Sequence, residues 1–506
     1  MRSTAQLLVE VLVTSSRGFS NRDSSALKRP LCGVTRRSRC STDFVHPSRP
    51  QNYFKYYLFY KMSKLFNYGR SVLLWYCHDF VNFRLQELYS ISKMYNIKFE
   101  WLVEPSLKDP FFLINVSSQT DVEKIMSRTV LIRSAYELWA KSKTLTDIHS
   151  KMKDVPKSFS EPYRKKDVSF RILVESFGKK INLDYKVKRI EELEFMDFKG
   201  PIKLNNPDQS FVFMEYYGCD RNNSPEEPFQ YFFGRWLADG QRLISHKINL
   251  SKRKFIGNTT MDPLLSLIMA NMACVKPGDI VLDPFVGSGG ILVSAAHFGG
   301  CVFGTDIDYL MLHGKAKPSR LNQKKRAPDE NTRANMKQYG YESQYMDVLV
   351  ADASLPLWRS PSFFDAIITD PPYGIRESTE KIGSEKNCKI PDHLAPNHIP
   401  SKVTYTLQDI IEDLLDFSSI HLKLHGRLVY WMPAFNEDFD KKQLPTHPCL
   451  ELISFCNQAL TEHSSRYLIT MEKIKENNNS EEKSFVPESA SNFRKKYFET
   501  NKKKIM

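Results

Sequence analysis

The chain has 506 residues and a formal net charge of +14, because 72 Lys and Arg outnumber 58 Asp and Glu. At about 150 residues per domain the length predicts two or three domains, and a hydrophobic share of 41% excludes wholesale disorder. No apolar run approaches the roughly 18 residues of a membrane span. The nine cysteines include no CxxC pair, so we expect reduced thiols, no membrane segment and no metal site within the chain.

The basic excess lies mostly at the two ends of the chain. Residues 1–61 hold 11 Lys and Arg against 3 Asp and Glu, and residues 473–506 hold 9 against 5. The first segment is rich in Arg and Ser, as mitochondrial transit peptides are, but we interpret it as a disordered or optional extension. We therefore expect a cytoplasmic protein, and residues 1–61 leave a mitochondrial form open.

Residues 62–217 have the pattern of an α+β region, with apolar side chains at helical spacing in some segments and strand-like runs in others. The expected elements are helices at 84–95, from a cap at Asp121 toward Trp139 and at 188–195, and strands at 111–116 and 169–175. The region carries no catalytic constellation, so we interpret it as an accessory binding domain. A polar, proline-punctuated stretch then predicts a linker over 218–254.

From residue 255 the pattern alternates between strands and helices. Asp262 and Pro263 are typical of the first turn of a helix. The other expected elements are strands at 280–283, 302–306, 348–352, 366–370 and 427–431, helices at 291–297 and 407–422, and a hairpin of 450–456 with 467–471. This alternation predicts an α/β fold with a parallel, doubly wound sheet over 255–475. The polar residues 476–506 predict a mobile tail.

The first chemical motif is Asp283-Pro284-Phe285-Val-Gly287-Ser-Gly289-Gly, between a strand and a helix. Its glycines permit a tight turn and close approach of a ligand to the backbone. The motif has neither the spacing of a dinucleotide site nor the Lys of a phosphate loop. A carboxylate before the turn suits a cationic ligand, and S-adenosylmethionine, with its ammonium and sulfonium groups, fits better than NAD. A purely structural turn is the alternative.

Two further acidic residues follow the next two predicted strands. Asp306 comes 23 residues after Asp283, a spacing that suits hydrogen bonds to ribose hydroxyls, and Ile307 would then lie against the adenine. Asp352 and Ala353 end the following strand and could contact the edge of the adenine. Each Asp alone could be a helix cap, but their order along the chain favours one binding edge.

The sharpest motif is Asp370-Pro371-Pro372-Tyr373, directly after a strand. Two prolines fix φ and remove both amide donors, which leaves the Asp370 carboxylate and the Pro371 carbonyl as acceptors. They can hold both hydrogens of an exocyclic amino group and direct its lone pair at a methyl donor. Tyr373 offers a ring on which a base can stack.

These motifs resemble those of the amino-methyltransferases. From Met62 to about Lys475 the chain more closely resembles the catalytic subunits of eukaryotic tRNA guanosine-10 N2-methyltransferases. The segments that carry this resemblance are 231–241, 255–262, 303–308, 364–377 and 463–472. It implies a Rossmann-like seven-stranded methyltransferase sheet, preceded by a ferredoxin-like segment and a THUMP RNA-binding domain. It also implies tRNA as substrate and, as partner, a small zinc-binding protein that activates methyltransferases.

The resemblance further implies roles for individual residues. Asp370, Pro371, Pro372 and Tyr373 would handle the guanine amino group. The cofactor S-adenosylmethionine would be bound by Asp283, Pro284, Phe285, Gly287, Gly289, Asp306, Ile307, Asp352 and Ala353, with Asn258 and Thr260 bordering its methionine end.

A basic insert follows the predicted ribose site. We expect its six cations to contact tRNA phosphates, with a solvated loop as the alternative: Lys315, Lys317, Arg320, Lys324, Lys325 and Arg326. Two other functions stay open from the sequence. One is an adenine-N6 or cytosine-N4 methyltransferase, because Asp-Pro-Pro-Tyr alone does not separate these from guanine. The other is a non-catalytic RNA-binding protein with a methyltransferase fold.

Overall fold

The computed structural model describes residues 69–359, 361–384, 400–440, 444–477 and 483–503. The N-terminal extension expected at 1–61 lies outside these residues. The chain divides into two compact units, of which the first holds described residues up to 74, 98–122 and 135–238. The second unit holds residues 75–97 and 123–134 together with the chain from 239 onward.

The N-terminal half of the chain builds a mixed seven-stranded sheet in the order β2-β3-β1-β4-β7-β6-β5. Its strands are β1 (Arg70–Tyr76), β2 (Phe99–Trp101), β3 (Phe111–Val116), β4 (Ile132–Ser142), β5 (Phe170–Phe177), β6 (Gln209–Tyr216) and β7 (Gln230–Asp239). The helices in this half of the chain are α3 (Arg84–Met94), α4 (Gln119–Met126), α5 (Leu145–Lys153), α6 (Lys157–Ser160) and α7 (Leu183–Glu191). Helices and strands share this half, as the sequence predicts.

Two expectations for this half are wrong in detail. The helix expected to run from Asp121 toward Trp139 ends at Met126, and Trp139 lies in the strand β4. The ring of Trp139 packs against Phe211 at 5.1 Å between ring centroids, so burial among aromatic side chains outweighs the helical pattern. In the stretch expected to be a linker, residues 230–239 form β7, which pairs with β6 over six residues.

Residues 75–97 and 123–134 belong to the second unit because a buried carboxylate ties them to it. Glu87 of α3 accepts hydrogen bonds from Thr129 Oγ1 at 2.7 Å, from the backbone N–H of Val130 at 2.9 Å and from Asn271 Nδ2 at 2.9 Å. Asn271 lies in α9 (Pro263–Met272). Composition alone divides the chain at residue 218. The structure instead assigns these two early segments to the second unit.

The second unit is built on a seven-stranded sheet in the order β10-β9-β8-β11-β14-β16-β15. Its strands are β8 (Ile280–Asp283), β9 (Cys301–Asp306), β10 (Tyr345–Val350), β11 (Phe364–Thr369), β14 (Leu422–Phe435), β15 (Leu450–Ala459) and β16 (Ser464–Lys473). The first five in this order run parallel to their neighbours, and β16 runs antiparallel to both β14 and β15. The predicted parallel sheet and closing hairpin are thus confirmed.

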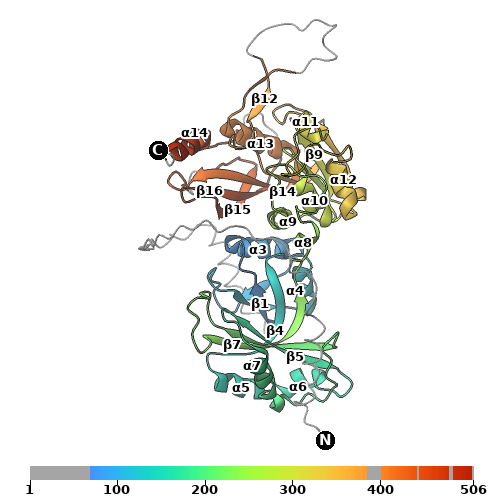
Figure 1. The fold of residues 1–506 in the computed structure, drawn as a ribbon, viewed down its shortest axis with the longest axis vertical. Coiled ribbons are helices and arrows are strands. Elements are labelled where there is room, and N and C mark those ends of the chain that lie inside the picture. The colour runs from blue at the N-terminus through green and yellow to red at the C-terminus, as the bar shows by residue number, and fades with distance from the viewer. Residues whose placement is uncertain (1–68, 360, 385–399, 441–443, 478–482, 504–506) are drawn as a thin grey trace. The chain divides into compact units, whose positions relative to one another are not determined.

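The other described helices and strands of this unit surround or extend that sheet (Figure 1). The helices are α8 (Ile244–Lys247), α9, α10 (Gly290–His297), α11 (Tyr309–Leu312), α12 (Thr332–Tyr339), α13 (Leu407–His421) and α14 (Ser489–Lys503). A short pair, β12 (Glu380–Ile382) and β13 (Lys402–Thr404), stands apart from the main sheet. Asp262 caps α9 as expected, accepting from the N–H of Leu264 at 2.8 Å.

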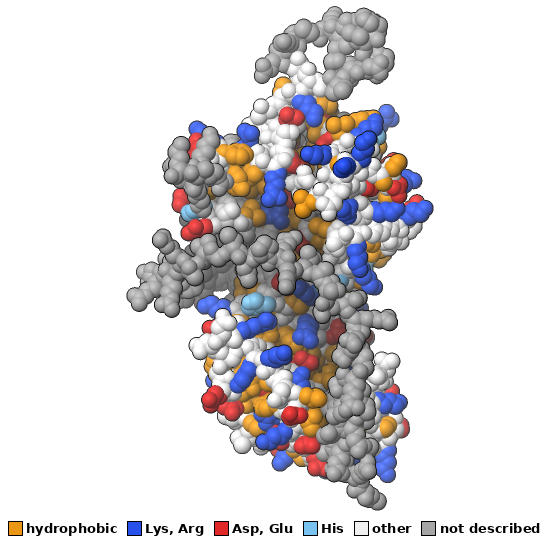
Figure 2. All heavy atoms as spheres, in the orientation of Figure 1, with side chains coloured by type: hydrophobic (Ala, Val, Ile, Leu, Met, Phe, Trp, Pro, Cys, Tyr) orange, Lys and Arg blue, Asp and Glu red, His pale blue; other side chains and the backbone are white. Residues whose placement is uncertain are grey.

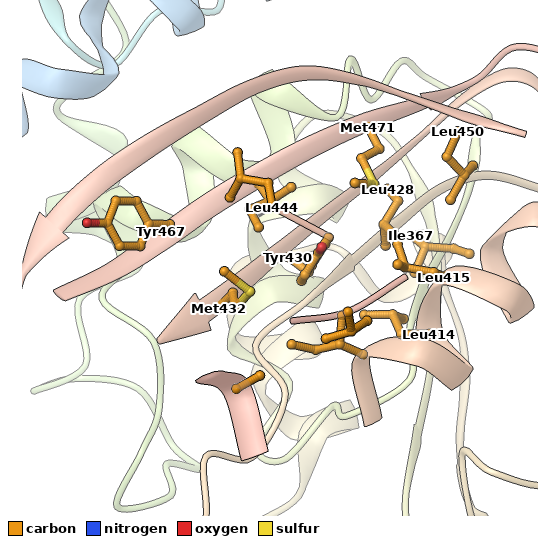
Figure 3. Packing of buried hydrophobic residues seen from close by; sticks show 14 of the residues in the cluster. Ile367, Leu414, Leu415, Leu428, Tyr430, Met432, Leu444, Leu450, Tyr467 and Met471 are labelled. Atoms are coloured by element: carbon orange, nitrogen blue, oxygen red, sulfur yellow. The ribbon is translucent and has the colours of Figure 1, made fainter. Parts of the chain in front are cut away.

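One hydrophobic core lies against this sheet (Figure 3). Leu414 and Leu415 of α13 pack with Leu428 of β14 and Met471 of β16, all nearly inaccessible to solvent. None of the helices in the described ranges is long and apolar enough to cross a membrane.

The stretch expected to be a mobile tail contributes to the same core. Its described part ends in α14, where Phe493 is 1% exposed and lies 5.3 Å from the ring of Phe435. Ala490 and Val486 are also buried there. Apolar side chains three and four residues apart give the polar tail one face that packs as a helix, which the overall composition conceals.

Candidate active site

Three carboxylates meet at one edge of the second sheet because they end three adjacent parallel strands. Asp283 ends β8, Asp306 ends β9, and Asp370 directly follows β11. The order β9-β8-β11 puts Asp283 in the middle. Thr369 Oγ1, the last residue of β11, donates to Asp283 Oδ1 at 2.7 Å. Open α/β sheets bind their ligands beyond this edge, so the fold places the three acids where a ligand would lie.

The glycine-rich turn after Asp283 lines the site with backbone and leaves space beside it. The backbone N–H of Phe285 donates to Asp283 Oδ1 at 3.1 Å, which fixes the carboxylate at the start of the turn. Gly287 has φ +49°, and a side chain there would point into open space. Gly289 has φ +77°, and a side chain there would collide with Thr332. Gly287 therefore leaves room for a ligand, whereas Gly289 permits close packing at the start of α10.

Each of the three acids has a raised pKa, and burial is the main cause. Burial raises the pKa of Asp283 to about 7, and the carboxylates of Asp306 and Asp370 add to this rise. Burial also raises the pKa values of Asp306 and Asp370, to which the nearby Glu377 carboxylate contributes. Gathering several acids in one partly desolvated place costs free energy that a bound cation would offset. The residues present therefore fit a ligand with an ammonium or sulfonium group.

Asp306 holds the backbone of the turn while keeping capacity for a ligand. Its Oδ2 accepts from the N–H of Gly287 at 2.8 Å, and its Oδ1 accepts from the N–H of Asp308 at 2.9 Å. A carboxylate has about four acceptor sites, so two hydroxyl groups could still bind. Ile307 is partly exposed beside it.

Asp352 lies two residues beyond the end of β10 and is 2% exposed. Its Oδ1 accepts from the N–H and the hydroxyl of Ser354 at 2.9 and 2.8 Å, and its Oδ2 accepts from the N–H of Ile382. These donors already satisfy most of the carboxylate, so Asp352 holds a turn and β12 in place. A neighbouring pocket with a mainly apolar lining includes Pro284, Phe285, Ala353, Trp358 and Leu414.

The Asp370-Pro-Pro-Tyr turn carries both a donor and a cation next to its carboxylate. The Tyr373 hydroxyl donates to Asp370 Oδ1, and Arg466 Nη1 donates to Asp370 Oδ2 at 3.2 Å. Arg466 opposes the rise that burial causes in the pKa of Asp370. Pro371 is buried and Pro372 half-buried, so the turn is rigid. The ring of Tyr373 partly packs against the core, a position that the sequence does not predict.

Asn258 and Thr260 lie before the capped helix α9 but differ in surroundings. The Thr260 hydroxyl lies 2.7 Å from the hydroxyl of Ser288 in the glycine-rich turn and bonds to the backbone of Gly257. Asn258 is exposed. Thr260 thus borders the turn directly, whereas the structure gives Asn258 no comparable contact among its described hydrogen bonds.

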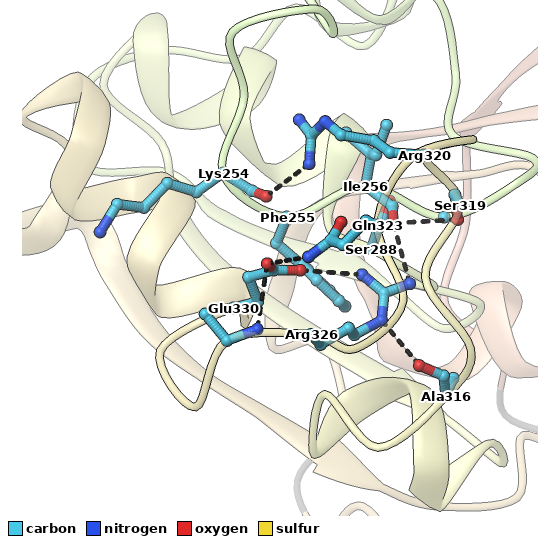
Figure 4. A network of polar contacts seen from close by, with 12 residues as sticks. Lys254, Phe255, Ile256, Ser288, Ala316, Ser319, Arg320, Gln323, Arg326 and Glu330 are labelled. Carbon is cyan, nitrogen blue, oxygen red and sulfur yellow. Dashed lines mark hydrogen bonds and ion pairs between the residues drawn. The ribbon is translucent and has the colours of Figure 1, made fainter.

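The basic insert divides into two groups of side chains, and Figure 4 shows the two arginines that form the first group. The side chain of Arg326 is 3% exposed and donates to the carbonyls of Ala316, Lys317 and Ile256. Its guanidinium lies 4.9 Å from the ring centroid of Phe255. Arg320 donates to the carbonyl oxygens of Lys254 and Arg253. These donors hold the loop against residues 253–256, and contact of both arginines with phosphates stays a prediction.

The four lysines of the insert are exposed: Lys315, Lys317, Lys324 and Lys325. Lys315 lies 5.0 Å from the ring centroid of Tyr309, which stacks on His313 at 4.0 Å. In Figure 2, Lys and Arg side chains gather over the part of this unit that carries α11, β9 and α12. An exposed aromatic ring among lysines is the kind of surface that binds nucleic acid.

Three residues at the site had no role assigned from the sequence. Arg466 comes from an antiparallel strand 96 residues after Asp370. Glu377 accepts from the Thr259 hydroxyl and raises the pKa values of Asp306 and Asp370. Arg494 of α14 donates to the carbonyl of Gly374 at 2.7 Å, directly after the Asp370-Pro-Pro-Tyr turn. Arg466 and Glu377 lie in segments that carry the family resemblance, and this resemblance could have indicated them as site residues. No sequence pattern indicated Arg494.

The comparisons agree with this fold. Residues 70–242 match the Tmrp11 THUMP N-terminal domain family, and residues 251–386 match the RMKL-like methyltransferase domain family. The fold and the strand-end acids thus define an S-adenosylmethionine-dependent methyltransferase with a THUMP-type N-terminal region.

Curated relatives narrow the class to one family. The tRNA (guanine(10)-N(2))-methyltransferase TRMT11 of Gallus gallus is 45% identical over 441 residues, which cover 86% of this chain and 96% of the relative. The Homo sapiens protein of the same name is 45% identical over 446 residues, with the same coverage. The Dictyostelium discoideum protein of this name is 37% identical over 437 residues, which cover 81% of this chain and 83% of the relative. The chain belongs to the family of tRNA (guanine(10)-N(2))-methyltransferases.

Proposed function

We propose that this chain transfers a methyl group from S-adenosylmethionine to the exocyclic N2 of guanosine 10 in tRNA. The observation that carries the proposal is the meeting of Asp283, Asp306 and Asp370 at one sheet edge in a chain that is 45% identical to enzymes named for this reaction. A chain that had lost catalysis would have no need to keep three acids with raised pKa values together.

The acids at the ends of β8 and β9 would hold the methyl donor. Asp283 is nearly inaccessible to solvent and lacks a cation among its described hydrogen-bond partners, so it would attract the ammonium group of the methionine end. Gly287 leaves space beside it. Asp306 would accept from ribose hydroxyls, and Ile307 would lie against the adenine. Asp352 would contribute mainly by fixing the turn that carries Ala353.

The turn after β11 would hold the base. S-adenosylmethionine supplies an electrophilic methyl group when bound. Asp370 and the Pro371 carbonyl would accept the two hydrogens of the guanine amino group and orient its lone pair. The nitrogen becomes acidic only as the new bond forms, so no strong base is needed beforehand. Ionised Asp370 offers both of its oxygens as acceptors, and Arg466 favours that form.

We further propose a division of labour along the chain. The region 62–217 would bind tRNA, and the region 255–475 would hold the methyl donor and the target base. The exposed lysines Lys317, Lys324 and Lys325 would contact phosphates near the catalytic edge. We propose a cytoplasmic location, which imaging of the full chain would test against a mitochondrial form directed by residues 1–61.

A small zinc-binding protein would complete the enzyme. Strand β10 lies at the end of the sheet order and pairs only with β9 among the described strands. Met346, Leu349 and Val350 of this strand are 43–48% exposed, an apolar edge that free proteins normally avoid. We propose that the partner adds a strand here. Replacing Leu349 with Glu should abolish co-purification, whereas Glu342→Gln nearby should leave it intact.

The test of the main proposal is methyl transfer to unmodified tRNA, followed by mass analysis and mapping of the modified nucleoside. With the zinc-binding partner present, we expect N2-methylguanosine at position 10 and none when position 10 is adenosine. N6-methyladenosine or N4-methylcytidine as the product would overturn the choice of base. Tight tRNA binding without any methylated product would favour a non-catalytic role.

A further inference from the structure

Arg466 stands beside the catalytic carboxylate in a position that methyl transfer to an amino group does not by itself require. Its Nη1 lies 3.2 Å from Asp370 Oδ2, at an oxygen that the turn offers to a substrate. The two side chains are 14% and 23% exposed, so both reach the site from the protein interior. A cation next to an acceptor changes which hydrogen-bond pattern the site can bind.

The guanidinium is fixed from several sides. Its Cζ lies 4.1 Å from the ring centroid of Trp431, its Nε donates to Gln458 Oε1 at 2.8 Å, and its Nη2 lies 3.6 Å from the Met261 sulfur. Trp431 is fully buried, and its Nε1 lies 3.2 Å from the Met269 sulfur. Arg466 is therefore held before any substrate arrives, as a group that reads a substrate must be.

The donors of Arg466 are only partly used within the protein. A guanidinium has five N–H groups, and one of the contacts of Arg466 is to a thioether sulfur, a weak acceptor. A ligand oxygen could displace this contact at little cost. The arginine thus pairs with Asp370 and retains donors for a base.

The combination of acceptors and a donor in this part of the site complements guanine. Tyr373 donates to Oδ1 of Asp370, and Arg466 donates to Oδ2 and also bonds to the Tyr373 side chain, so carboxylate acceptors and a guanidinium donor lie together. The edge of guanine presents the N2 amino group, then N1–H, then the O6 acceptor, which is the complementary pattern. N1 of adenine carries a lone pair in place of the N1–H of guanine. Adenine would therefore place one acceptor against another at Oδ2. Reading of a base through this edge requires that it leave its pair, as enzymes acting on bases arrange.

We propose that Arg466 donates a hydrogen bond to O6 of the target guanine and so makes the site select guanine over adenine. This inference rests on the proposed function and adds to it the residue that chooses the base. A site built to bond a particular polar group discriminates strongly against analogues that lack it, because its own groups are then left unpaired.

The experiment compares tRNA carrying guanosine at position 10 with tRNA carrying 2-aminopurine there, under single turnover with the partner present. The analogue keeps the amino group at C2 but lacks O6 and N1–H. For Arg466→Met we expect the rate on guanosine to fall about 100-fold. The rate on 2-aminopurine should fall by only about tenfold, because that base offers Arg466 no oxygen and only the effect of Arg466 on Asp370 is lost.

Equal losses on the two bases would overturn the proposal, since they would show that Arg466 acts only through Asp370. If Arg466→Met does not fold, Arg466→Lys gives the same comparison, because a lysine keeps the charge but not the planar donors. Failure of the unaltered enzyme to methylate guanosine 10 at all would instead reject the proposed function. The two failures are therefore distinguishable.

Discussion

Two buried carboxylates in the same unit have opposite surroundings. Glu87 is fully buried and accepts from Thr129, Val130, Leu131 and Asn271, four donors supplied by the protein. Asp283 is 1% exposed and accepts from Thr369 and Phe285, and its other close neighbours include two further acids. The comparison indicates that a carboxylate which joins segments is surrounded by hydrogen-bond donors of the protein. A carboxylate that binds a cationic ligand has fewer such donors and lies near other acids.

Burial raises the pKa of both carboxyl groups. The two differ in whether their neighbours lower the pKa again or raise it further. At Glu87 all the named partners oppose the rise, and no acid contributes to it. At Asp283 the carboxylates of Asp306 and Asp370 add to the rise, and the pKa reaches about 7. The following predictions test whether the strand-end acids depend on a ligand and Glu87 does not.

The largest effect is expected from Asp370→Ala. Removing the acceptor that orients the amino group should lower the rate of methyl transfer by about 10³-fold, as loss of a preorganised polar group in an active site does. S-adenosylmethionine binding, measured by calorimetry, should change less than about threefold. The matched control is Asp365→Asn at the other end of β11, where the carboxylate pairs with Lys423, and it should keep full activity.

Next is Glu87→Gln, which changes only one group of a fully satisfied network. The new amide places donors against backbone N–H groups, so we expect the free energy of unfolding to fall by about 3 kcal/mol. Urea denaturation would measure this, with the exposed Glu342→Gln as control. An unchanged midpoint would show that Glu87 does not join these segments.

Asp283→Asn should raise the free energy of unfolding at neutral pH, whereas Glu87→Gln should lower it. The raised pKa means that stability falls as pH rises from about 4 to 7, where the native carboxyl must ionise while the unfolded one already has. At pH 8 the variant should therefore be more stable, by about 2 kcal/mol, and at pH 4 the gain should vanish. Its affinity for S-adenosylmethionine should nevertheless fall. A variant less stable than the parent at pH 8 would contradict the ligand-binding interpretation of this group.

The smallest effect is expected at the exposed lysines of the insert. Changing Lys317, Lys324 and Lys325 together to Ala should reduce the slope of log affinity for tRNA against log salt concentration by about 2. Protein stability should be unchanged. In contrast, Arg326→Ala should destabilise the protein, because its donors hold three backbone carbonyls. An unaltered slope in the triple variant would exclude this surface from the tRNA interface.

Part of the site follows from the sequence because parallel strands have a simple geometry. Strands that end at Asp283, at Asp306 and just before Asp370 bring those carboxylates to one edge whatever the lengths of the connections between them. The turn glycines and the helix cap at Asp262 are likewise local signals.

The remainder depends on contacts that no local pattern records. Arg466 reaches Asp370 from an antiparallel strand, and α14 joins the core through a few apolar side chains in a polar tail. A run of basic residues predicts a charged surface, yet the side chain of Arg326 is buried because backbone carbonyls of a folded loop accept its hydrogen bonds. Segments 75–97 and 123–134 join the later unit through Glu87, a single side chain in an ordinary helical pattern.

The most direct test of the central claim is the proton balance of S-adenosylmethionine binding, measured by calorimetry in buffers of different ionisation enthalpy. If the ammonium group of the methyl donor pairs with ionised Asp283, whose pKa in the free protein is about 7, binding at pH 6.5 should release about 0.8 proton. Affinity should also be about tenfold weaker at pH 6 than at pH 8, and Asp283→Asn should remove both effects. Binding without proton release, equally tight at both pH values, would contradict the account.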